Sequence, residues 1–120
     1  MKDFWDISDA ELEVMEMLWG QDGSISQPRL LALFEESGKK WKRQTLNTFL
    51  IRLEAKGMVR RDHGIVETIH SREEYRYTQM KAAVDSLYDG QISDFILAFT
   101  KKNDISKEDA KELIRILENS

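Results

Sequence analysis

The segment from Lys39 to Arg61 is predicted to form an amphipathic helix followed directly by a strand, and this helix–strand unit restricts the folds that the chain can adopt. It reads KKWKRQTLNTFLIRLEAKGMVRR. Its apolar side chains recur at the spacing of one helix face, and they are Leu46, Phe49, Leu50 and Leu53. This spacing predicts a helix from about Arg43 to Lys56, with Gly57 as a left-handed C-terminal stop.

A hairpin is predicted directly after this helix. Met58 to Arg61 has the composition of a short strand, and Ile65 to His70 alternates partially, as a second strand would. Asp62-His63-Gly64 between them is typical of a tight turn.

Two shorter helices are predicted before the basic segment. Ser8 and Glu11 form a capping box that starts the first helix, which carries the apolar Trp19 and ends near Gly20. Asp22-Gly23-Ser24 then reads as a turn.

The second helix begins after Ser26, with Pro28 in its first turn, and ends near Ser37. Three helices followed by a hairpin form a winged helix-turn-helix, so we predict a mostly α fold with a small β-hairpin.

The rest of the chain is predicted to be helical. One helix runs from Arg72 to about Leu87 and is broken at Asp89-Gly90, a second spans Ile92 to Phe99, and a third begins at Ser106. We therefore expect a winged-helix DNA-binding domain at residues 1–75 and a helical dimerisation domain at residues 76–120.

The last two helices are short and strongly apolar on one side. Alone they cannot bury that surface, so a second copy of the chain is expected to cover it, forming a homodimer. The side chains expected at this interface are Ile92, Phe95, Ile96, Phe99, Leu113, Ile114 and Leu117.

Positive charge is concentrated in the segment that defines the fold. The whole chain is acidic, with a formal net charge of -4, yet this segment has Glu54 as its one acid. Its basic residues are Lys39, Lys40, Lys42, Arg43, Arg52, Lys56, Arg60 and Arg61. A basic helix and strand in an acidic protein indicate a local contact with the DNA backbone.

The polar face of the basic helix offers groups of two kinds. Lys42, Arg43 and Arg52 can neutralise phosphates. Thr45 and Thr48 can donate to phosphate oxygens or touch a thymine methyl, and Gln44 and Asn47 have the amide geometry that reads adenine N6 and N7. The hairpin adds Arg60, Arg61 and His63, which we expect to contact an adjacent backbone or minor groove. The predicted partner is a double-stranded DNA operator.

Three other interpretations compete with DNA binding. The helix face can simply be solvated, or the winged helix can be a protein–protein interaction module without sequence-specific DNA binding. A metal site at the hairpin would use His63, His70, Asp62 and Glu67, but two histidines across a hairpin are a weak signal.

No enzyme and no cofactor are predicted. The chain has no cysteine, and no Ser/His/Asp order, Gly-rich phosphate loop or zinc-type spacing stands out. The first residues, MKDFWDIS, contain no apolar signal core, and no apolar run approaches the ~20 residues of a membrane span. These features lead us to expect a cytoplasmic protein without membrane insertion.

Taken together, these segments resemble the penicillinase-repressor family, the winged-helix repressors of β-lactamase and methicillin-resistance genes. The matching pieces, in order, are ISDAELEVMEMLW, WKRQTLNTFLIRLEAKGMV, SREEY, VDSLYDGQISDFILAF and DISKEDAKELIRIL. The resemblance implies a dimeric repressor that binds a dyad operator through its N-terminal lobe, with the last helices forming the dimer.

The resemblance also raises the question of how the repressor is released. In the antibiotic branch a membrane-bound sensor protease signals β-lactam, and the repressor is cut between an Asn and a Phe. The matching place here is Ala98-Phe99, where Phe99 is kept and the Asn is not. A copper-sensing branch uses a cysteine-rich tail, which this chain does not resemble.

The predicted basic helix departs from the family pattern at two places. Lys42 and Arg43 stand where a Ser or Thr cap followed by Pro is common, and Asn47 replaces a familiar basic residue. These differences suggest a different operator sequence.

Overall fold

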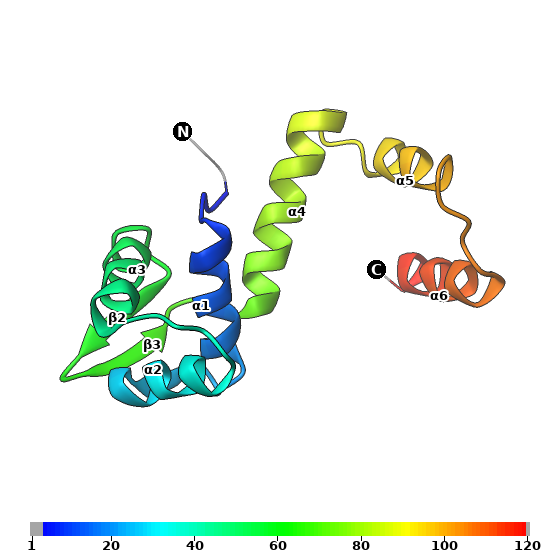
Figure 1. Cartoon of the computed structure of the whole chain (residues 1–120). Helices are drawn as coiled ribbons and strands as arrows, with labels where there is room; N and C mark the ends of the chain where they lie inside the picture. Colours follow the sequence, from blue (N-terminus) through cyan, green and yellow to red (C-terminus); the bar gives the residue numbers. More distant parts are fainter. Residues whose placement is uncertain (1–3, 120) are drawn as a thin grey trace. The chain divides into compact units, whose positions relative to one another are not determined.

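A computed structural model describes residues 4–119 of the chain. The helices are α1 Asp9–Trp19, α2 Gln27–Glu36, α3 Arg43–Ala55, α4 Arg72–Tyr88, α5 Ile92–Thr100 and α6 Lys107–Glu118. The strands are β1 Ser24–Ser26, β2 Val59–Asp62 and β3 Ile65–Thr68 (Figure 1). A mostly helical chain with a small antiparallel sheet confirms the predicted fold class.

The predicted helix starts are confirmed by their hydrogen bonds. At α1 the Ser8 Oγ accepts from the Glu11 backbone N–H at 3.1 Å, and the Glu11 carboxylate accepts from the Ser8 N–H at 3.4 Å. Ser26 and Ser106 also cap α2 and α6, since their hydroxyl oxygens accept from the Arg29 and Asp109 backbone N–H groups. The N-cap of α3 is Lys42, whose side chain makes no capping hydrogen bond. The first N–H groups of α3 therefore have no partner in the side chain of the N-cap, and an external acceptor can bind them.

The sheet contains a strand that the sequence did not predict. β1 pairs antiparallel with β3, in register Ile25 to Val66, giving the strand order β1-β3-β2. The predicted turn at Asp22-Gly23-Ser24 is wrong at its last residue, because Ser24 already belongs to β1. The strand with which β1 pairs lies some forty residues away in the chain. A local pattern of three residues therefore does not predict β1.

The β2–β3 hairpin is the wing, and it turns over two residues. His63 and Gly64 have φ values of 50° and 79°, so both occupy the left-handed region that a type I′ turn requires. Asp62, predicted in the turn, is the last residue of β2 and pairs with Ile65. The Gly64 carbonyl accepts from the Gln27 N–H at 2.9 Å, which ties the tip of the wing to the start of α2.

The core lies between α1, α2, α3 and the sheet. Its buried side chains are Val14, Met15, Leu18, Leu30, Phe34, Leu46, Leu50, Leu53, Met58, Val59 and Val66. Trp41 packs between Phe34 and Phe49 at the edge, with tilted rings and centroid distances of 4.6 and 5.1 Å. Trp19 packs against this core and donates its Nε1–H to the His70 carbonyl at 2.9 Å. Helix α3 is therefore held in place along its entire apolar stripe.

The chain divides into two compact units within α4. The first unit ends at Met80 and the second begins at Lys81. Gln79 belongs to the first unit, since its amide exchanges two hydrogen bonds with the Trp5 backbone, at 2.9 and 3.1 Å. In the second unit Tyr88 meets Phe95 edge to face, with ring centroids 5.8 Å apart. In the described part of the chain, no helix has the length and apolar character needed to cross a membrane.

Candidate nucleic-acid interface

The polar face of α3 is open along the helix. Lys42, Arg43, Gln44, Thr48 and Arg52 are exposed, whereas Thr45 and Asn47 are half-buried. The opposite face contributes the buried Leu46, Leu50 and Leu53 to the core. One face anchors the helix and the other presents the predicted DNA-contacting side chains to a ligand.

The cations on α3 and at its N-cap differ from most of the other cations of the basic segment, although Lys40, like them, has no ion-pair partner among the described residues. Among the described residues, Lys42, Arg43 and Arg52 have no ion-pair partner. By contrast, Lys39 pairs with Glu13 at 2.7 Å and Lys56 with Glu11 at 2.6 Å, and both acids lie on α1. The positive charge of α3 is therefore left for a partner outside the unit, such as DNA phosphate.

On the wing, Arg60 is exposed but already paired. Its guanidinium contacts the Glu67 carboxylate of β3 at 3.2 Å. This hydrogen bond, together with the attraction between the charges, raises the pKa of Arg60 and lowers the pKa of Glu67. Glu67 thus offsets much of the positive charge that Arg60 brings to the wing.

The side chain of Arg61 is turned toward the helices. Its Nε–H donates to Glu54 Oε1 at 2.7 Å, and its Nη1 donates to Gln27 Oε1 at 3.2 Å and to Asn47 Oδ1 at 2.7 Å. The side chain is only 22% exposed. The sequence predicts the same backbone contact for Arg60 and Arg61, but Arg61 instead joins the wing to α2 and α3.

Two polar side chains of α3 have part of their bonding capacity occupied. The Oδ1 of Asn47 accepts from Arg61, which fixes the direction of the amide, so the paired donor–acceptor contact with adenine would need the one remaining lone pair of the same oxygen. The Thr48 hydroxyl donates to the Gln44 carbonyl at 3.0 Å, which leaves its lone pairs and its methyl group for DNA.

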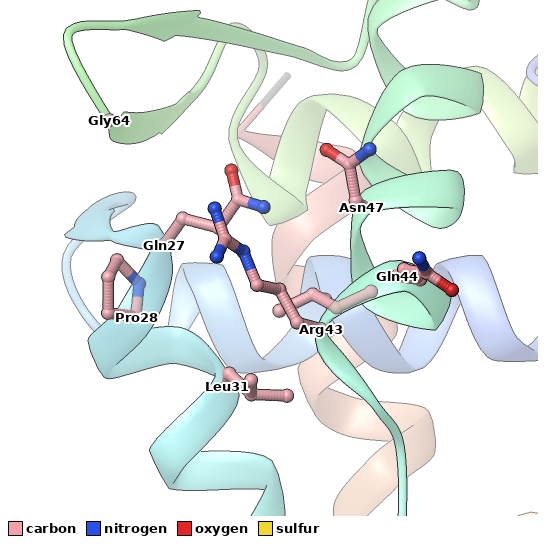
Figure 2. Close-up of a pocket in the computed structure, with 8 residues that line it drawn as sticks. Gln27, Pro28, Leu31, Arg43, Gln44, Asn47 and Gly64 are labelled. Atoms are coloured by element: carbon pink, nitrogen blue, oxygen red, sulfur yellow. The ribbon is translucent and has the colours of Figure 1, made fainter.

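A pocket of about 730 Å³ opens at the start of α3. Its lining comes from α2, α3 and the wing tip, and consists of Gln27, Pro28, Leu31, Arg43, Gln44, Leu46, Asn47 and Gly64. Figure 2 shows Gln27, Arg43 and Asn47 around this opening, with Gly64 at the tip of the wing. Gln27 is not among the residues that the sequence pattern predicts at this site, because only the tertiary structure brings the first residue of α2 close to α3.

His63 stands at the tip of the wing. Its side chain is 93% exposed, with Nδ1 2.6 Å from Asp62 Oδ1. His70 contacts Glu74 instead, at 2.9 Å, and that hydrogen bond lowers the pKa of Glu74. Within residues 4–119, the structure gathers no group of three or more metal-ligating side chains.

Comparison with known proteins then identifies the family. A family model described as "Penicillinase repressor" matches residues 7–119. The chain belongs to the penicillinase repressor family. It is similar to the Penicillinase repressor of Bacillus licheniformis, with 30% identity over 122 residues, covering 98% of this chain and 94% of the relative. It is also similar to the Methicillin resistance regulatory protein MecI of Staphylococcus aureus strain N315, at 26% identity, covering 94% of each chain.

Membership gives the chain its general role. Penicillinase repressors are non-enzymatic regulators of transcription, so the chain is a DNA-binding transcriptional repressor. The open α3, whose Arg43 and Arg52 have no ion-pair partner among the described residues, and the wing both belong to the first unit.

Proposed function

We propose that the chain represses transcription as a homodimer that binds a dyad operator, placing α3 of each protomer in a major groove. The observation that carries this proposal is the set of cations on α3 and at its N-cap that have no ion-pair partner among residues 4–119, beside half-buried Thr45 and Asn47. The residues proposed to contact DNA are Lys42, Arg43, Gln44, Thr45, Asn47, Thr48, Arg52, Arg60 and His63, with Arg61 acting through its neighbours.

The second unit supplies the dimer in this proposal. Ile92, Phe99, Ile114 and Leu117 are 50–56% exposed in the single chain, and Phe95, Ile96 and Leu113 are half-buried. Large apolar side chains exposed at this density on short helices favour an interface with a second copy. A two-fold dimer doubles the phosphate contacts and matches a two-fold operator.

The relatives suggest the regulated genes. Their names refer to penicillinase and to methicillin resistance, so we propose that this repressor controls β-lactam-resistance genes or related ones. The α3 residues Lys42, Arg43 and Asn47 differ from the pattern expected of the family, which supports a different operator sequence.

Selection from a random duplex library with the full chain tests the proposal. We expect enrichment of a dyad sequence, with binding that falls steeply as salt is raised but keeps its sequence preference. Binding to an acidic protein with no preference among duplexes would instead support the alternative, a protein–protein interaction module.

The ion pair on the wing leads to a matched pair of variants. Arg60→Gln should weaken binding to all duplexes alike and reduce the slope of log K against log salt by about 0.9 for each phosphate that is no longer neutralised. Glu67→Gln, which releases Arg60 from its partner 3.2 Å away, should strengthen binding to all duplexes. Fluorescence anisotropy across a salt series measures the affinity of both variants for duplex DNA. The proposal requires the affinity to fall in Arg60→Gln and to rise in Glu67→Gln. Equal affinity of the two variants would argue against wing contact with phosphate.

Another prediction concerns release from DNA. It assumes, as part of this proposal, that a sensor protease inactivates the repressor by cutting it. A protease that demands Asn before Phe should cut poorly between Ala98 and Phe99. Both residues lie inside α5, where Ala98 is half-buried and the Phe99 carbonyl accepts from the Asn103 N–H at 3.1 Å. Cleavage therefore needs local unwinding in addition to acceptance of a small apolar residue.

Immunoblotting of β-lactam-treated cells checks this prediction, and Ala98→Asn is the matched variant. We expect no fragment ending at residue 98 from the natural chain and a clear fragment from the variant. An inducer-dependent fragment of that size from both chains would show that the protease does not require Asn.

A further inference from the structure

One guanidinium fixes the direction of two amides on different helices. The Arg61 Nη1 donates to Gln27 Oε1 on α2 and to Asn47 Oδ1 on α3, at 3.2 and 2.7 Å. A guanidinium has donors and no acceptor, so only an amide oxygen can face it. The NH₂ groups of Gln27 and Asn47 are therefore the ends that remain for a ligand.

Arg61 itself has little capacity left for DNA. Both of its Nη1–H groups are directed at these two amides, and Nε and Nη2 lie 2.7 and 2.6 Å from Glu54 Oε1. One Nη2–H remains, on a side chain that is 22% exposed. The negative charge of Glu54 also balances the positive charge of Arg61. Arg61 is thus a positioning residue, which orients the groups that meet DNA.

The part of the pocket between α2 and Asn47 consequently presents donors, whereas Gln44, which also lines the pocket, can donate or accept. Gln27 and Asn47 line it together with Arg43, whose guanidinium has no ion-pair partner among the described residues (Figure 2). Glu54 is not part of the lining that the structure describes. A group that fits this pocket offers more than one hydrogen-bond acceptor and no donor opposite the Asn47 amide.

We propose that this donor cluster reads a guanine edge in the major groove, with Asn47 as the specificity-determining residue and Arg61 holding it in the donating direction. This inference rests on the proposed operator binding through α3. Guanine presents two acceptors, O6 and N7, whereas adenine and cytosine each place an amino donor in the groove. Phosphate is also an acceptor, but residues at the start of a recognition helix lie where base edges are met.

The expected discrimination has a definite direction. Adenine in place of the guanine turns its N6 amino donor toward the Asn47 NH₂, and the Arg61 bond keeps that amide from rotating to accept it. The substitution should weaken binding by about 10- to 100-fold, the range of a good base contact. Replacing guanine N7 with carbon, as 7-deazaguanine, should weaken binding as well, without changing any phosphate.

The test uses the full chain and the duplex selected from a random library. Wild type should discriminate guanine from adenine at one dyad-related position. Asn47→Asp keeps an acceptor for Arg61 but removes the donor, so this discrimination should be lost. Arg61→Gln should lose it too, and the double variant Asn47→Ala/Arg61→Gln should lose no more than Asn47→Ala alone. Arg60→Gln, on the same strand, should bind more weakly and keep the discrimination.

The outcomes separate this inference from the proposal on which it rests. If wild type binds no duplex with preference, operator binding itself fails. If wild type discriminates and both Asn47→Asp and Arg61→Gln still do, the guanine assignment is overturned. If neutralising one phosphate weakens binding and 7-deazaguanine has no effect, the pocket binds the DNA backbone. That outcome also overturns the guanine assignment. Circular dichroism confirms folding, and Asn47→Asp decides the matter if Arg61→Gln does not fold.

Discussion

A chain that ends at Met80 should fold and yet bind the operator about 10²- to 10⁴-fold more weakly than the full chain. The winged helix would keep its core, because all the buried side chains around α1, α2 and α3 lie before that point. The cut belongs after Met80, since a cut near Tyr77 would remove Gln79 and its two hydrogen bonds to Trp5. The deletion removes the second unit, and with it the coupling of two half-sites.

A single substitution in the full chain separates dimerisation from the deletion itself. Ile114, on α6, is 54% exposed, and Ile114→Asp places a charge on the proposed interface. Ser86→Asp is the matched control, because it adds the same charge to the same unit at an exposed position on α4. Analytical ultracentrifugation at micromolar concentration should show a monomer for Ile114→Asp and a dimer for the wild type and for Ser86→Asp.

Operator affinity must follow the oligomeric state in these variants. The monomeric variant should match the truncated chain, and the control should match the wild type. A wild-type chain that sediments as a monomer while binding the operator tightly would contradict the proposed dimer. The exposed Leu97 and Ile116, at 57% and 50%, would then need another explanation.

The features that sequence predicted well are those set by nearby residues. The Ser8–Glu11 capping box, the left-handed Gly57 after α3 and the break at Asp89-Gly90 each depend on side chains or backbone angles within a few positions. The apolar stripe of α3 was likewise visible, because its spacing of three and four residues repeats along the helix itself. Element types and most boundaries followed from these signals.

The features that sequence missed depend on residues that are distant in the chain. β1 exists because Ser24–Ser26 meets β3, and the direction of Arg61 is set by Gln27, Asn47 and Glu54 from two helices. A count of basic residues treats Arg60 and Arg61 as equivalent, yet they point differently because alternate residues of a strand face opposite sides of the sheet. The candidate interface was therefore located from sequence, while the division of roles within it required the structure.

The partner of Lys56 also could not be predicted from the sequence, and replacing Lys56 should have a large effect on stability. Lys56 belongs to the basic segment by sequence, but its Nζ lies 3.0 and 2.6 Å from the two carboxylate oxygens of Glu11. The Glu11 side chain is 3% exposed and the Lys56 side chain 34%. This pair connects the C-terminal end of α3 to the first turn of α1, so it holds α3 against the core.

Lys56→Met should lower the free energy of unfolding by about 2–4 kcal/mol, because it leaves a buried carboxylate with no opposite charge. The partial exposure of Lys56 places this figure somewhat below that of a fully buried pair. Urea denaturation measures the loss. Lys39→Met is the matched control, since its partner Glu13 is 44% exposed, and it should change stability by less than about 1 kcal/mol.

The charge of Glu11 must be the cause of that loss. Glu11→Gln removes the charge but keeps an oxygen that can accept from the Ser8 N–H. The double variant Glu11→Gln/Lys56→Met should therefore be more stable than Lys56→Met alone. Lys56 is paired with Glu11, so Lys56→Met should also leave the salt dependence of operator binding unchanged once the protein is folded. A reduced salt slope would instead return Lys56 to the DNA-binding surface, and a double variant no more stable than the single one would remove the buried charge as the explanation.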